Sequence, residues 1–187
     1  MASIVHVLGI SGSLRKPSYN TGLLLAASEL LPEGMTLEVF DLAPIPLFNQ
    51  DLVDSGNIPE PVRQFKARIA AADALLIATP EYNYSMPGVL KNAIDWASRP
   101  VQGSPLDGKP LAMMGAGGGM GTSRAQYHLR QVAVFTNMFP LNKPEVTVQR
   151  AHEKFDTHGH LTDEPTRRQV RALLEALAAW TRRLRGG

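Results

Sequence analysis

Residues 9–20 read GISGSLRKPSYN, and this segment decides the fold because of what flanks it. Residues 4–10 form an apolar run rich in β-branched side chains, which predicts a buried parallel strand. Residues 20–31 carry apolar side chains at helical spacing, and Pro32 and Gly34 end the predicted helix. The segment therefore predicts a polar loop that joins a strand to a helix, as in the repeating unit of an α/β fold.

The same alternation continues along the rest of the chain. Further strands are predicted at residues 36–42, 73–79, 110–115 and 145–148, and further helices at residues 62–71, 87–97, 122–135 and 165–185. Five strands separated by helices predict a flavodoxin-like doubly wound parallel sheet, in the order 2-1-3-4-5, with helices on both faces. Because no linker, repeat or low-complexity segment interrupts the chain, we expect residues 1–187 to form a single domain.

The composition excludes several classes of function. The chain contains no cysteine, which excludes disulfides and thiolate chemistry. The formal net charge is only +2 and the basic residues do not cluster with aromatic ones, so we expect no nucleic-acid surface. No apolar run approaches the roughly 18 residues of a membrane span, and we expect a cytoplasmic protein. His158 and His160 flank a glycine without an evident third ligand, so we expect a turn there and no metal site.

Three polar or glycine-rich loops follow the first, third and fourth predicted strands. In a doubly wound sheet the ligand binds at the carboxyl ends of the strands, near the point where the strand order reverses. For the order 2-1-3-4-5 the loops that meet there are residues 11–20, 80–86 and 116–122. We therefore expect these loops to form one binding site.

The first of these loops has the chemistry of a phosphate site. Ser11, Ser13 and Ser18 offer hydroxyl groups, Arg15 offers a positive charge, and the helix that opens at Asn20 adds backbone amides. The loop lacks the lysine of a P-loop and the glycine spacing of a Rossmann fingerprint. It therefore favours one terminal phosphate over a bridging diphosphate. The alternative is that these residues only cap the helix, although a cap needs one such residue.

The other two loops are suited to a flat ring. Tyr82 and Tyr84 lie between two prolines after the third strand, where aromatic side chains bind planar groups or form an interface. The alternative is that both tyrosines pack against the following helix. Residues 116–122 contain four glycines, which indicates a close approach of the backbone to a ligand or a sharp bend.

Two motifs together resemble the NAD(P)H-dependent FMN reductase family. The first is G-S-L-R-x-x-S-x-N after the first strand, and the second is P-E-Y-N-x-S-x-P-G-x-L-K-N-A-I-D-W after the third. The resemblance covers nearly the whole chain and is greatest for the chromate and quinone reductase branch. It implies a flavodoxin-like protein that binds FMN, in a homodimer or homotetramer with the flavin site near a subunit boundary.

The resemblance also implies which residues bind the cofactor. The phosphate and ribityl chain would be surrounded by Ser11, Ser13, Leu14, Arg15, Ser18 and Asn20. The flavin ring would be lined by Pro80, Glu81, Tyr82, Asn83 and Tyr84. Its pyrimidine end would face a loop that reaches Gly121 and contains Gly117, Gly118 and Gly119.

The activity implied by the resemblance is that of an FMN-dependent NAD(P)H oxidoreductase. NADPH or NADH would reduce FMN, and a quinone, flavin, azo compound or metal oxyanion would then accept two electrons in a ping-pong mechanism. We expect no catalytic side chain, because the flavin supplies the reactivity, but Arg15 and Arg124 could attract the nucleotide. One alternative is a flavodoxin-like electron carrier that does not oxidise NAD(P)H, although such carriers are usually acidic. Another is a nucleotide-binding protein without flavin.

Residues 43–59 form a long loop punctuated by proline. Its apolar residues Ile45, Leu47 and Phe48 either cover the core or contact another subunit, and we favour the subunit contact. A polar network at such a contact could be formed by Tyr84, Arg124, Tyr127 and Glu145.

Overall fold

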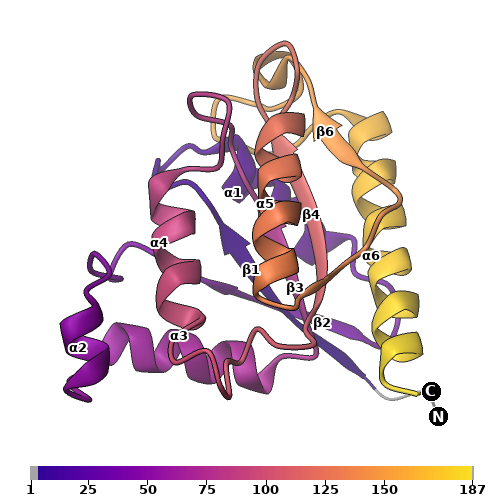
Figure 1. Cartoon of the computed structure of the whole chain (residues 1–187). Coiled ribbons are helices and arrows are strands. Elements are labelled where there is room, and N and C mark those ends of the chain that lie inside the picture. The colour runs from indigo at the N-terminus through magenta and orange to yellow at the C-terminus, as the bar shows by residue number, and fades with distance from the viewer. Residues whose placement is uncertain (1–3, 187) are drawn as a thin grey trace.

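The computed structural model describes residues 4–186, which are built around a sheet of parallel strands (Figure 1). The sheet has the order β2-β1-β3-β4-β5, and β6 also pairs with β4. This order confirms the flavodoxin-like fold predicted from the sequence. The strands are β1 (Val5–Ser11), β2 (Met35–Phe40), β3 (Ala74–Ala78), β4 (Pro110–Ala116), β5 (Phe139–Pro140) and β6 (Val146–Val148).

Helices cover both faces of the sheet, each over its own hydrophobic core. One core joins α1 and α6 to the first face, and the other joins α3, α4 and α5 to the second. The helices are α1 (Tyr19–Glu29), α2 (Gln50–Asp54), α3 (Glu60–Ala71), α4 (Gly88–Ala97), α5 (Ser123–Phe135), η1 (Ala151–Glu153) and α6 (Glu164–Leu184). The helix boundaries therefore lie within one or two residues of those predicted.

The alternation of side chains along the central strands explains why the sequence shows continuous apolar runs. In β1, Val5 and Val7 contribute to the first core, whereas Leu8 and Ile10 contribute to the second. Successive side chains of a strand point to opposite faces, and here both faces are covered by helices. Most positions of a central strand are therefore apolar, and the exposed His6 near the start of β1 is an exception.

The prediction of a single fifth strand was incomplete. Residues 145–148 contain β6, but a second short strand, β5, also pairs with β4 closer to its start. Between the pairs Pro110–Phe139 and Met114–Val146, β4 advances four residues while its partner segment advances seven. Pro140 and Pro144 lack the N–H that a continuous ladder needs, so the intervening residues leave the sheet.

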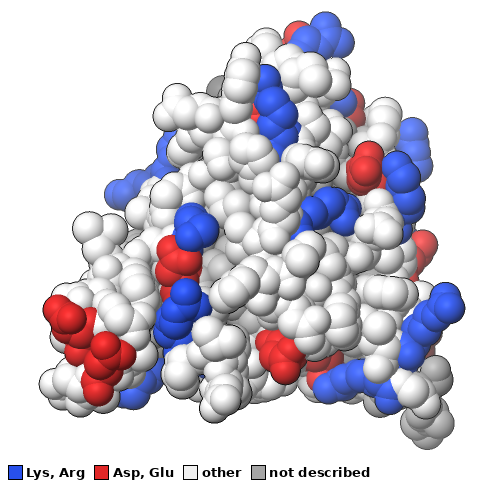
Figure 2. Space-filling model, in the orientation of Figure 1, with Lys and Arg blue, Asp and Glu red and all other residues white. Residues whose placement is uncertain are grey.

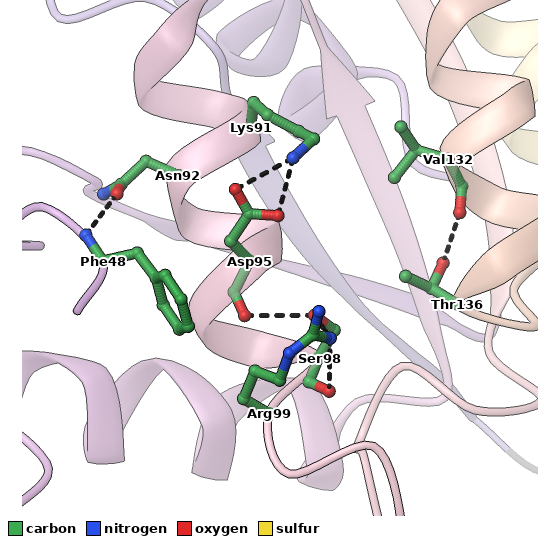
Figure 3. Close-up of polar contacts among 8 residues, drawn as sticks. All are labelled: Phe48, Lys91, Asn92, Asp95, Ser98, Arg99, Val132 and Thr136. Carbon is green, nitrogen blue, oxygen red and sulfur yellow. Dashed lines mark hydrogen bonds and ion pairs between the residues drawn. The ribbon is translucent and has the colours of Figure 1, made fainter. Parts of the chain in front are cut away.

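The interpretation of the loop at residues 43–59 as a subunit contact was wrong for two of its three apolar residues. Ile45 is buried, and the Phe48 ring lies edge-on to the Trp96 ring with centroids 5.0 Å apart. The Phe48 amide donates to Asn92 Oδ1 at 2.8 Å (Figure 3). Only Leu47 is exposed, at 85%. The loop, which also holds the unpredicted α2, therefore covers the second core.

The longest helix among residues 4–186 is α6, with 21 residues. None of the helices in this part of the chain is both long enough and apolar enough to cross a membrane.

Candidate functional site

A cavity of about 320 Å³ lies where the loops after β1, β3 and β4 meet. Most of the residues predicted for the site line it, namely Ser13, Arg15, Ser18, Asn20, Pro80, Glu81, Tyr82, Gly117 and Gly118. The predicted residues outside its lining are Ser11, Leu14, Asn83, Tyr84 and Gly119. The three loops chosen from the sequence thus form one concave site at the carboxyl edge of the sheet, as the position of the switch point requires.

The first loop is organised by its own hydroxyl groups. Ser18 is the N-cap of α1, and its side chain accepts from the amides of Asn20 and Thr21. Ser11 Oγ accepts from the Ser13 amide at 3.2 Å, so it braces the loop from outside the cavity. Helix capping is therefore present at this loop. Capping accounts for Ser18, whereas Ser13 and Arg15 line the cavity without capping the helix, and the Arg15 amide donates to Ser13 Oγ at 3.3 Å.

Asn20 connects the start of α1 to the end of β4. Its side-chain amide donates to the Ala116 carbonyl at 3.0 Å, and its Oδ1 accepts from the Ala116 amide at 3.0 Å. The residue is 3% exposed. Since β4 ends at Ala116, these two bonds fix the start of α1 against the strand that leads into the glycine loop. Asn20 was predicted to surround the phosphate; it lines the cavity, and its side chain also holds two of the three loops together.

Residues 82–85 form a tight hairpin after β3. The amide of Tyr82 donates to the Ser85 carbonyl at 2.9 Å, and the Ser85 amide donates back at 3.0 Å. The two central residues, Asn83 and Tyr84, have φ of 50° and 66°. This left-handed conformation is costly for residues other than glycine and concentrates at functional sites. The hairpin places Tyr82 on the cavity and turns Tyr84 away from it.

Glu81 and Arg124 join this hairpin to α5. Glu81 Oε1 accepts from Arg124 Nε, and Glu81 Oε2 accepts from the backbone amides of Arg124 and Ala125 at 3.0 and 3.3 Å. The hydrogen bond to the Glu81 carboxylate raises the pKa of Arg124 above its ordinary value. The Arg124 guanidinium also lies 3.7 Å from the centre of the Tyr84 ring. Because its charge is already paired, Arg124 is a poor candidate for attracting the nucleotide, and Arg15 is the better one.

The glycine loop after β4 closes on itself. A Cβ on Gly117 would lie 2.6 Å from the Gly121 carbonyl oxygen, and Gly121 itself has φ of 60°. These two glycines are explained by the bend of the loop. Gly118 differs, because a Cβ there would meet no atom of the described chain within 4 Å, although the residue lines the cavity. A close approach by a ligand would account for glycine at this position.

Sequence reasoning missed a fourth contribution to the cavity, from the segment after β6. Ala151 and His152 line the cavity, and the Ala151 amide donates to the Gly117 carbonyl at 2.9 Å. Tyr19 and Ala116 line it as well. A signal was available for the fourth segment, because the carboxyl end of every parallel strand reaches the same edge of the sheet.

His158 and His160 lie in the predicted turn, away from this cavity. The backbone amides of both residues donate to Asp156 Oδ1, at 2.9 and 2.8 Å. The two donors fix the short connection between η1 and α6, and they lower the pKa of Asp156 together with the His160 side chain. The segment is therefore explained by the geometry of its turn.

The comparison with known proteins decides the family. Residues 5–153 match the family described as NADPH-dependent FMN reductase. This chain belongs to that family. The chain is 54% identical to an NAD(P)H-dependent FMN reductase of Pseudomonas aeruginosa over 187 residues, which is all of both chains. It is 48% identical to an NAD(P)H:quinone oxidoreductase of Solanum tuberosum, over 98% of this chain and 96% of that one.

A solved structure agrees with this assignment. The structure of FerB, a flavoenzyme NAD(P)H:acceptor oxidoreductase of Paracoccus denitrificans, matches with a TM-score of 0.87 and 34% identity, over 96% of this chain and 98% of that one. The protein is therefore an oxidoreductase that uses FMN and NAD(P)H.

The residues of the cavity fit FMN. Hydroxyl groups, a guanidinium and the start of α1 gather at one side, where a phosphate needs many donors. Pro80, Tyr82 and the backbone at Gly118 contribute uncharged groups that suit a flat ring, and the carboxylate of Glu81, which also lines the cavity, is paired with Arg124. The chemistry of this donor set therefore matches a ligand with a phosphate at one end and a ring at the other.

Proposed function

We propose that this FMN reductase passes electrons from NAD(P)H to a quinone in a ping-pong mechanism. Bound FMN would supply the redox chemistry, accepting a hydride and then giving up two electrons. The observation that carries the proposal is the single cavity in which Ser13 and Arg15 lie on one loop and Tyr82 and Gly118 on two others. Two relatives named as NAD(P)H- or NADPH:quinone oxidoreductases, from Solanum tuberosum and Arabidopsis thaliana, support a quinone as acceptor.

Each loop has one task in this proposal. Ser13 and Arg15 bind the phosphate at the start of α1, which Ser18 caps and where the helix dipole adds to their effect. Tyr82 and Pro80 cover part of the ring and exclude water from it, while the glycine loop presents its backbone to the polar edge of the ring. No side chain has to transfer a proton, so we assign no catalytic residue. Flavins, azo compounds and metal oxyanions such as chromate belong to the wider set of acceptors that an open ring face admits.

The competing proposal is an electron carrier that binds FMN without oxidising NAD(P)H, and one experiment separates the two. We expect anaerobic NADPH to bleach the absorbance of bound FMN within the time of one turnover in a stopped-flow instrument. Double-reciprocal plots of initial rate against NADPH concentration, at several quinone concentrations, should then give parallel lines, because both substrates use one cavity in turn. Yellow colour that persists under anaerobic NADPH and NADH would leave only the electron carrier.

We further propose that the outer face of α5 joins two copies of this chain, in a homodimer or homotetramer. Between Ala125 and Phe135 the helix carries a single Lys, Arg, Asp or Glu, which is Arg130, and most side chains over it are uncharged (Figure 2). Val134 and Phe135 are 81% and 68% exposed. Val101, also exposed, lies with Phe135 on one shallow cavity. A second copy of the same apolar face is the complementary partner for such a patch.

The assembly can be tested by placing charges on this face. We expect Val134→Glu with Phe135→Glu to weaken self-association by about 100-fold or more, because four carboxylates would be buried in a two-fold interface. Analytical ultracentrifugation measures the change in mass. Leu47→Glu is the matched control, since Leu47 is as exposed but lies on the loop before α2. An unchanged mass for the α5 variant would place the interface elsewhere.

A cytoplasmic location remains a prediction that the absence of cysteine supports.

A further inference from the structure

The hairpin of residues 82–85 is held against α5 at three points. Glu81, directly before the hairpin, binds the first turn of the helix. The Tyr84 ring is covered by the Arg124 guanidinium. One turn further along the helix, His128 Nδ1 lies 2.9 Å from Ser85 Oγ. Helix α5 is thus the support on which the conformation of the hairpin rests.

Glu81 is the central part of this support. Helix α5 begins after Thr122, whose side chain caps no amide of the helix within residues 4–186. The first amides of a helix need partners, and a carboxylate is the acceptor that the helix dipole favours. Glu81 supplies it from another strand, since its Oε2 accepts from two of these amides. Its side chain is only 8% exposed, so water competes little for the carboxylate.

The hairpin needs such a support because of its backbone. Asn83 and Tyr84 both adopt left-handed conformations, which cost free energy and persist only where the surroundings impose them. The Tyr82–Ser85 hydrogen bonds close the turn but do not orient it on the sheet. The bonds of Glu81 and Arg124 to the hairpin and to α5 provide that orientation.

We propose that Glu81 is a positioning residue, which locks the Tyr82–Ser85 hairpin to α5 and so fixes the wall of the cavity over which NAD(P)H reaches the ring. The proposal rests on the placement of the ring beside Tyr82 given above. Glu81 lines the cavity, but its carboxylate oxygens are bonded to Arg124 and to the first amides of α5 rather than presented to a ligand. Glu81 acts through the hairpin. Arg124 is its partner in that role, and we do not assign Arg124 to nucleotide binding.

Hydrogen exchange of the holoenzyme tests the lock directly. We expect Glu81→Ala to speed exchange of the Tyr82 and Ser85 amides about tenfold or more, because opening of the hairpin no longer breaks the contacts to α5. Glu81→Gln should have an intermediate effect, since its carbonyl still accepts from the helix amides but lacks the charge that pairs with Arg124. The matched control is Glu38→Gln. Glu38 lies on β2, and its carboxylate pairs with Arg68 on α3 at 3.4 Å. It should leave both amides unchanged.

The spectrum of bound FMN and the kinetics give the second measurement. We expect Glu81→Ala and Arg124→Ala to change the visible circular dichroism of FMN and to raise KM for NADPH about fivefold to tenfold, with kcat changed less than about twofold. Tyr82→Ala is the reference, because it alters the same wall without touching the lock. If Tyr82→Ala changes the dichroism and neither lock variant does, the proposal for Glu81 is overturned while the ring placement stands. If Tyr82→Ala also has no effect, the ring placement itself is wrong. Where Glu81→Ala does not fold, Glu81→Gln and Arg124→Ala decide by the same criteria.

Discussion

Replacing Ser13 and Arg15 together by alanine is expected to weaken FMN binding by about 100-fold or more. Each lost bond from a hydroxyl or guanidinium to a phosphate contributes roughly 1.5–3 kcal/mol, and tenfold in affinity corresponds to about 1.4 kcal/mol. Both residues line the cavity at the start of α1, and Arg15 is the cation of that loop that reaches the cavity lining. Once FMN is bound at saturating concentration, the rate of its reduction by NADPH should change less than about threefold, because the phosphate lies far from the ring.

Fluorescence titration of the apoprotein with FMN measures the affinity, and anaerobic stopped-flow mixing measures the reduction. Lys16→Ala is the matched control, since it removes a cation from the same loop but from outside the cavity lining. We expect it to reduce FMN affinity less than about threefold, in line with a screened surface charge. If the double variant binds FMN as tightly as the control does, the phosphate lies elsewhere. A slow reduction step with normal affinity would contradict the division of the cavity into a phosphate end and a ring end.

The sequence predicted the parts of the site that depend on local order. The loops at residues 11–20, 80–86 and 116–122 were placed together because each follows a buried strand, and parallel strands end at one edge of the sheet. The hydroxyl groups and Arg15 could be assigned to an anion from their residue types alone. These inferences need only the order of the elements, which hydrophobic periodicity reveals.

The sequence could not predict the contacts that connect distant segments. Asn20 lies 96 residues from its partner Ala116, and Glu81 lies 43 residues from Arg124. No periodic pattern marks such pairs, so the sequence did not predict that Asn20 bonds to Ala116 or that Glu81 pairs with Arg124. The packing of Phe48 on Trp96 escaped prediction for the same reason. In each case the sequence shows the type of the residue, but the role of the residue depends on a partner that is distant in the sequence.

The cavity has different tolerance to substitution at its edge and at its base. Arg15 is an exposed residue of the rim, whereas Asn20 and Ala116 are nearly fully buried. Removing a rim donor deletes contacts to the ligand and leaves solvent to replace them. Removing a buried partner leaves polar groups without hydrogen bonds, which costs free energy in the protein itself. The base of the site should therefore couple stability to cofactor binding.

Replacing Asn20 by alanine is accordingly expected to lower the free energy of unfolding by about 2–5 kcal/mol, because the buried amide and carbonyl of Ala116 lose their partners together. The same change should weaken FMN binding about tenfold, since the start of α1 and the glycine loop lose their connection. Urea denaturation of the apoprotein and FMN titration measure the two effects. If the alanine variant does not fold, Asn20→Asp serves in its place: it keeps an acceptor for the Ala116 amide, but it sets a buried carboxylate against the Ala116 carbonyl and should also lower stability and FMN affinity.

Asn92 provides the matched control for Asn20, because its side chain has the same two-bond pattern far from the cavity. Its Oδ1 accepts from the Phe48 amide at 2.8 Å (Figure 3), and its side-chain amide donates to the Pro46 carbonyl at 2.9 Å. Asn92 is less buried, so Asn92→Ala should cost only about 1–2 kcal/mol. It should leave FMN affinity unchanged, since α4 and the loop before α2 do not line the site. Equal losses of affinity in the two variants would mean that general destabilisation, and not the bond between Asn20 and Ala116, governs how tightly the cofactor is held.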